Sequence, residues 1–78
     1  MPKLPRDLSP DQVIRAFERA GWQKRPTKKK GAKHTVLVRP GAETILPIPR
    51  HRTVKTGTLR RLIALAGLTV DEFIRLLQ

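Results

Sequence analysis

The chain has 78 residues, and its 17 lysines and arginines outnumber its 6 aspartates and glutamates, so it carries a formal net charge of +11. A chain of this length supports one hydrophobic core, so we expect residues 1–78 to form a single domain; cysteine is absent, which excludes disulfides and thiolate metal sites. The excess of positive charge favours a polyanionic partner, with nucleic acid first, then an acidic protein, then an anionic membrane surface.

An extended lead and a helix are expected at the N-terminus. Two prolines disfavour helix within residues 1–8. Ser9 is placed to cap the helix that follows, Pro10 suits its first turn, and Gln12 completes a capping box. Gly21 is a natural stop for this helix. Its apolar stripe consists of Val13, Ile14, Ala16, Phe17 and Ala20.

Three short strands joined by tight turns are expected next, which predicts an antiparallel meander. The expected strands are residues 22–25, 34–39 and 44–48. Pro47 and Pro49 cannot donate hydrogen bonds to a neighbouring strand. The third strand should therefore end early or lie at an edge of the sheet.

Two helices are expected in the C-terminal part. A basic loop, Pro49–Lys55, leads to the first, for which Thr56 or Thr58 is the expected N-cap and Gly67 the stop. Thr69–Glu72 is a second capping box and opens the last helix. The apolar stripes are Leu59, Leu62, Ile63 and Ala66 in the first of these helices, and Phe73, Ile74 and Leu77 in the second.

The expected order is therefore α-β-β-β-α-α, an α+β fold with a three-stranded antiparallel sheet and helices packed on one face. The expected core consists of Val13, Ile14, Phe17, Val36, Val38, either Ile45 or Leu46, Leu62, Ile63 and Phe73. No apolar run reaches the roughly 18 residues of a membrane span, and the first ten residues lack the apolar centre of a signal peptide. We therefore expect a cytoplasmic protein that does not bind membranes.

The segment most suggestive of chemistry is residues 28–39, KKKGAKHTVLVR, in which a lysine-rich turn leads into a strand that opens with His34. Histidine has an unperturbed pKa of about 6.5, so it can accept or give a proton near neutral pH. A cationic turn beside an imidazole suits the binding and cleavage of a phosphodiester. The alternative interpretation is that the lysines are a solvated hairpin tip and His34 is a half-buried strand residue.

Six segments of the chain carry a resemblance to one known family, and together they span nearly its whole length. They are KLPRDLS at residues 3–9, the helix ending in Gly21-Trp22, the strand opening at residues 31–34, IPRH at 48–51, GTLR at 57–60 and AGLTVDEF at 66–73. In this order they resemble the HicA (YcfA-like) family of mRNA interferase toxins.

The resemblance implies a fold like that of the double-stranded-RNA-binding domain and a ribonuclease that needs no metal and no small-molecule cofactor. It also implies two partners, mRNA and an acidic HicB-like antitoxin that covers the active face.

The family's functional histidine opens the second strand, usually after Gly-Ser or Gly-Gly. Counted from Gly31 without a gap, Lys33 takes that position here, and a one-residue shift restores His34. Successive strand residues face opposite sides, which places His34 with Val36 and Val38 and places Lys33 on the other face. A lysine with an ordinary pKa near 10.4 is a poor base at pH 7, so we assign the catalytic role to His34.

The candidate roles follow from this assignment. His34 is the candidate general acid or base; the candidate RNA-binding residues are Lys28, Lys29, Lys30, Lys33, Arg50 and Arg52. His51 is a possible second acid or base, or an orienting residue. No metal ligands are assigned, because the carboxylates have plainer roles in caps, turns and exposed helix faces. Two other classes stay open: a non-catalytic basic module that binds RNA or an acidic protein, and, with less support, a DNA-binding helix-turn-helix in the last two helices.

Overall fold

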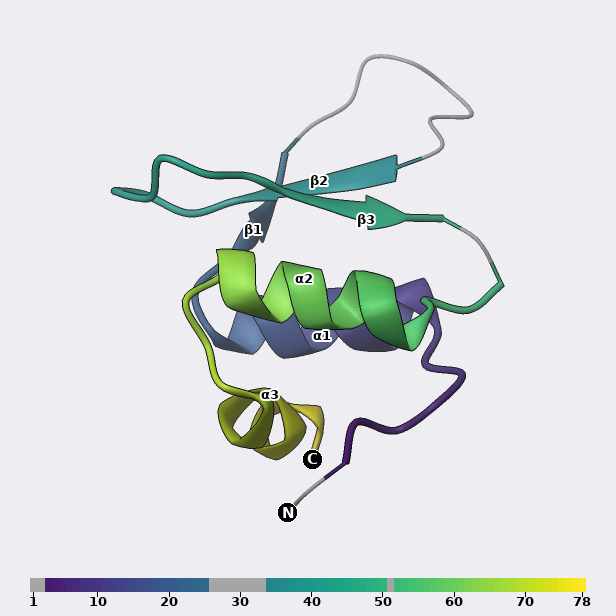
Figure 1. The fold of residues 1–78 in the computed structure, drawn as a ribbon. Helices are drawn as coiled ribbons and strands as arrows, with labels where there is room; N and C mark the ends of the chain where they lie inside the picture. The colour runs from purple at the N-terminus through teal and green to yellow at the C-terminus, as the bar shows by residue number, and fades with distance from the viewer. Residues whose placement is uncertain (1–2, 26–33, 51) are drawn as a thin grey trace.

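The computed structural model describes residues 3–25, 34–50 and 52–78. Its elements, in chain order, are α1 (Pro10–Arg19), β1 (Gln23–Lys24), β2 (His34–Val38), β3 (Leu46–Pro49), α2 (Thr56–Leu65) and α3 (Val70–Leu77). This confirms the expected α-β-β-β-α-α order and the α+β class. The sheet lies over α1 and α2, and α3 lies on the far side of these helices (Figure 1).

The helices α1 and α3 begin where their capping boxes predict, and α1 ends before Gly21 as expected. Ser9 Oγ accepts the N–H of Gln12 at 3.2 Å, and the Gln12 side chain accepts the N–H of Ser9 at 2.9 Å. The same reciprocal pair joins Thr69 and Glu72 at the start of α3, at 3.1 and 3.2 Å. Gly21 follows α1 with a φ of +100°, a left-handed conformation that favours glycine.

The start of α2 differs from the expectation that Thr56 or Thr58 caps it. The N-cap is Lys55, whose side chain makes no capping hydrogen bond. The N–H of Val54 donates to the carbonyl of Leu8 at 2.8 Å, in an isolated antiparallel bridge. Because this bridge holds the chain extended up to Val54, the helix starts directly after Lys55, and both threonines lie inside its first turn.

The sheet is antiparallel in the order β1-β2-β3, so β3 is an edge strand, as its prolines predicted. It runs from residue 46 to 49 rather than from 44 to 48. Along β3, the buried side chains of Leu46 and Ile48 alternate with those of Pro47 and Pro49. Since proline has no N–H, the donors for the ladder to β2 come from Leu46 and Ile48.

The buried apolar side chains form one cluster between the sheet and the helices. They are Leu4, Leu8, Val13, Ile14, Ala16, Phe17, Trp22, Leu37, Leu46, Ile48, Val54, Leu59, Leu62, Ile63, Ala66 and Phe73. The expectation that Val36 and Val38 belong to this core is wrong, because both are only half-buried, and Leu37 is the residue of β2 that is fully buried. Leu37 pairs with Leu46, so these two side chains share the face toward the helices. Ile45, the alternative to Leu46, is 43% exposed.

The helices α1 and α3 pack tightly against each other. The rings of Phe17 and Phe73 lie 5.1 Å apart between centroids, in a tilted arrangement favourable for aromatic pairs. The Arg19 guanidinium donates to the carbonyls of Leu76 and Gln78, at 2.7 and 2.6 Å. These hydrogen bonds fix the C-terminal end of α3 against α1.

Candidate functional site

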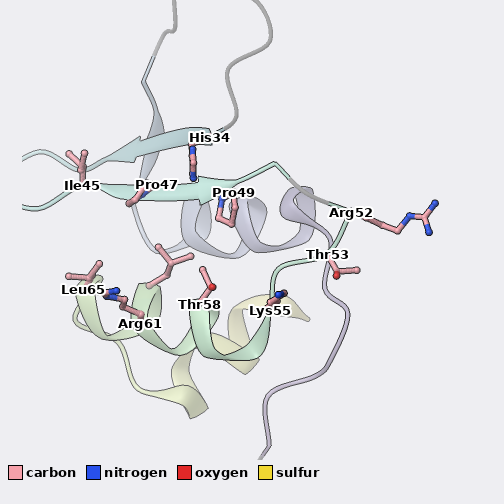
Figure 2. Close-up of a pocket in the computed structure, with 11 residues that line it drawn as sticks. His34, Ile45, Pro47, Pro49, Arg52, Thr53, Lys55, Thr58, Arg61 and Leu65 are labelled. Carbon is pink, nitrogen blue, oxygen red and sulfur yellow. The ribbon is translucent and has the colours of Figure 1, made fainter.

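An open groove of about 820 Å³ runs between the edge strand β3 and the exposed side of α2 (Figure 2). Its lining comes from β2, from β3 and the residue before it, from the segment before α2, and from α2 itself. The lining residues are His34, Ile45, Pro47, Pro49, Arg52, Thr53, Lys55, Thr58, Arg61, Leu62 and Leu65. The groove is therefore formed by segments far apart in the sequence.

His34 lies at the first position of β2, opposite Pro49 of β3, and its side chain is exposed. Residues directly opposite each other in an antiparallel pair point to the same side of the sheet. Since Thr35 and Leu37 turn toward the helices with their partners on β3, His34 faces away from the core. The imidazole is thus held by a strand backbone and remains accessible to a ligand in the groove. His34 is thus a strand residue, as the alternative interpretation expected, but it is exposed rather than half-buried.

Three cations line the groove, and none of its lining residues is acidic. Arg52 and Lys55 lie at one end, on the segment that leads into α2, and Arg61 lies on α2 toward the other end (Figure 2). All three side chains are exposed. Cations gathered around a concave surface without compensating carboxylates produce a local field that attracts anions.

The segment carrying Arg52 and Lys55 is positioned by the N-terminal lead. Leu4 and Leu8 of this lead are buried in the core, and Leu8 makes the bridge to Val54. Val54 is itself buried. The lead expected to be merely extended therefore has a structural role, because it fixes the chain between the two cations.

The end of the groove opposite Arg52 is apolar. Ile45 and Leu65 lie there, with Arg61 beside Leu65 (Figure 2). Ile45 and Leu65 are the large hydrophobic residues that are exposed in the described part of the chain, at 43% and 42%. We call Ile45, Pro47, Leu62 and Leu65 the apolar end of the groove.

The structure brings together two of the residues predicted from sequence, His34 and Arg52. Arg50 is exposed directly after β3 and is not part of the groove lining. The other predicted residues, Lys28, Lys29, Lys30, Lys33 and His51, lie outside the described residues.

Sequence reasoning missed the contribution of α2. Thr58, Arg61 and Leu65 recur at spacings of three and four residues, so they form a stripe on one side of the helix. Leu65 falls outside the apolar stripe assigned to the core, and an unassigned leucine beside an arginine was the available signal. Lys55 carried no such signal, because its position depends on the Leu8–Val54 bridge.

Residues 3–25, 34–50 and 52–78 lack a membrane-spanning helix and a metal-binding cluster. No helix there has the length and apolar composition to cross a membrane. In the same residues, no group of three or more histidine, aspartate or glutamate side chains is arranged to hold a metal ion.

Comparison with known proteins identifies a protein family. A family model described as the HicA toxin of bacterial toxin-antitoxin matches residues 10–68. No curated protein and no solved structure is significantly similar to the chain. The matched range runs from the first residue of α1 to the turn after α2, so it includes every residue that lines the groove.

Proposed function

The chain belongs to the HicA family of toxins from bacterial toxin–antitoxin systems, and we propose that it is a ribonuclease that cleaves mRNA in the cytoplasm and is held inactive by an acidic HicB-like antitoxin. The observation that carries this proposal is the position of His34. Its exposed imidazole opens a strand beside a groove that holds Arg52, Lys55 and Arg61 and no lining carboxylate.

The proposed reaction uses the nucleophile that RNA carries. The 2′-oxygen attacks the adjacent phosphorus as a base removes its proton, and the bond from phosphorus to the 5′-oxygen of the next nucleotide breaks as that oxygen gains a proton. The products are a 2′,3′-cyclic phosphate and a 5′-hydroxyl. His34 is the proposed acid or base, a role that contributes typically 10²–10⁴-fold to the rate. His51 is the candidate for the second proton transfer.

The cations have two proposed tasks. Arg52 and Lys55, on the segment that leads into α2, hold the phosphate backbone and stabilise the extra charge on the phosphoryl oxygens in the transition state. Arginine suits bidentate contact with phosphate, and lysine acts as a mobile point charge. Arg50 and the lysines at positions 28, 29, 30 and 33 are proposed to extend the RNA-binding surface beyond the groove.

The test is a cleavage assay with purified protein and single-stranded RNA. His34→Ala should reduce the cleavage rate roughly 10²–10⁴-fold while RNA affinity and melting temperature stay unchanged. RNA with a 2′-deoxy substitution at the cut site should bind and remain intact, and a chelator should leave the rate unchanged, because the nucleophile is the 2′-hydroxyl.

Lys33→Ala is the matched control for the register of the turn. It should weaken RNA binding without abolishing cleavage. If Lys33→Ala abolishes cleavage and His34→Ala does not, the assignment of His34 is wrong. If the wild-type chain binds RNA but neither cleaves it nor arrests growth when expressed, the non-catalytic binding module is the correct function.

A further inference from the structure

The apolar end of the groove is not used by the proposed ribonuclease chemistry. Ile45 and Leu65 remain more than 40% exposed there, although the core lies directly beneath α2 and β3. Large aliphatic side chains gathered at one end of a concave surface, beside a polar rim, are typical of interaction sites. We propose that this end anchors an acidic protein partner, which inserts an apolar side chain between Ile45 and Leu65 and places a carboxylate on Arg61, and that RNA does not occupy it.

The chemistry of the lining favours a protein side chain over a nucleobase. Proteins bind the bases of single-stranded nucleic acids largely by stacking them on aromatic rings or on the planes of arginine guanidinium groups. The three aromatic residues of the chain, Phe17, Trp22 and Phe73, are all buried in the core. The apolar end consists of leucine, isoleucine and proline, with Arg61 beside it as a planar cation. Branched aliphatic side chains instead pack well against other apolar side chains.

The charges favour an acidic partner over a second copy of this chain. Arg52, Lys55 and Arg61 share the groove with the apolar end, and no lining residue is acidic. Two copies meeting through this surface would oppose the same cations, and each chain carries a net charge of +11. An amphipathic acidic segment satisfies both the apolar end and the cations.

The N-terminal lead is not a candidate occupant, because Leu4 and Leu8 are already buried in the core.

The outer edge of β3 limits how the partner can bind through its main chain. Pro47 and Pro49 have no N–H, so the outer edge of β3 lacks these donors for an added strand. Strand addition at this edge is therefore disfavoured, and we expect affinity to come from side chains in the groove.

The groove therefore has two functional parts. The part of the groove lined by His34, Arg52 and Lys55 is shared by RNA and partner, which makes their binding competitive, whereas the apolar end serves the partner alone. The identity of the partner as an antitoxin rests on the proposed function. The division itself rests on the lining residues and predicts variants that separate neutralisation from RNA binding.

The experiment measures two dissociation constants for each variant. One is for the acidic HicB-like antitoxin proposed above, and the other is for a single-stranded RNA oligonucleotide. Leu65→Ala and Ile45→Ala should each weaken partner binding about 30-fold, as expected for an interface hot spot, and change RNA affinity less than about twofold. Leu65→Met, which keeps apolar volume, should retain partner binding.

A matched pair of arginine variants controls for net charge. Arg61→Ala and Arg60→Ala each remove one exposed charge from α2, but only Arg61 lines the groove. Arg61→Ala should weaken partner binding at least about tenfold, and Arg60→Ala less than about twofold. Equal effects of the two variants would overturn the carboxylate contact to Arg61.

Other results contradict the proposal outright. If Leu65→Ala weakens RNA binding and spares the partner, the apolar end is a nucleobase subsite. If the wild-type chain dimerises and Leu65→Ala makes it monomeric, the occupant is a second copy. If the HicB-like antitoxin does not bind, the proposed partner is wrong. Absence of RNA cleavage alongside the expected partner pattern would overturn the proposed function and leave this division of the groove standing.

Discussion

The two sides of α1 and α2 differ in how their polar groups and apolar surface are used. On the α3 side, two capping boxes are complete, Phe17 and Phe73 are in contact, and Arg19 donates to the last carbonyls of α3. On the β3 side, α2 starts at an N-cap without a side-chain hydrogen bond, and Ile45 and Leu65 are exposed.

This difference shows where the sequence departs from what stability alone favours. A serine or aspartate would cap α2 better than Lys55, and polar residues would suit the exposed positions of Ile45 and Leu65. Both departures fall on the lining of one groove, and both have a use in binding. Stability and binding should therefore be separable by mutation, with the largest stability effects on the α3 side.

The first prediction concerns the packing of α1 against α3. Phe17→Ala removes a fully buried ring and its contact with Phe73, so the free energy of unfolding should fall by about 3–5 kcal/mol. That is a large share of the total for so small a chain. Leu65→Ala, at 42% exposure on the groove side, is the control and should cost less than about 1 kcal/mol. Urea denaturation of both variants provides the measurement; similar midpoints would contradict the contrast between the two sides.

The parts of the fold that the sequence predicts well are those set by neighbouring residues. The Ser9–Gln12 and Thr69–Glu72 boxes and the glycine after α1 act within one turn, so their residue types are sufficient evidence. The edge position of β3 also follows from local chemistry, because a strand with two prolines cannot donate fully on both sides.

The inward face of β2 and the groove depend on contacts between distant segments. Val36, Leu37 and Val38 are consecutive apolar residues, so alternation alone does not decide which face is buried. The pairing of Leu37 with Leu46 decides it. A usable signal was present in β3, where leucine and isoleucine alternate with proline and thus mark the inward face. The orientation of α2, which makes Arg61 part of the site, had no local signal of this strength.

The second prediction concerns the different starts of α2 and α3. Thr69→Ala removes the side chain that caps α3 and should cost about 1 kcal/mol. Thr58→Ala makes the same chemical change inside the first turn of α2, where the side chain is exposed and is not the cap. It should change the free energy of unfolding by less than about 0.5 kcal/mol. If thermal denaturation shows Thr58→Ala to be as destabilising as Thr69→Ala, then Thr58 has a capping role that the described structure does not contain.

The last prediction concerns Lys55, the N-cap of α2, whose side chain makes no capping hydrogen bond. Lys55 has the extended backbone of an N-cap, with φ −64° and ψ 145°, so a serine there is placed to accept an N–H of the first turn. Lys55→Ser should stabilise the fold by about 0.5–1 kcal/mol.

Lys55→Ser also removes a groove cation, so the slope of log K against log salt for single-stranded RNA should flatten by about 0.7 if Lys55 contacts a phosphate. Lys55→Ala separates the two effects, because it loses the same charge without gaining a cap and should flatten the slope equally without the added stability. Equal stability of the serine and alanine variants would show that α2 gains nothing from a capping side chain, and an unchanged salt slope in both would place Lys55 outside the RNA-binding surface.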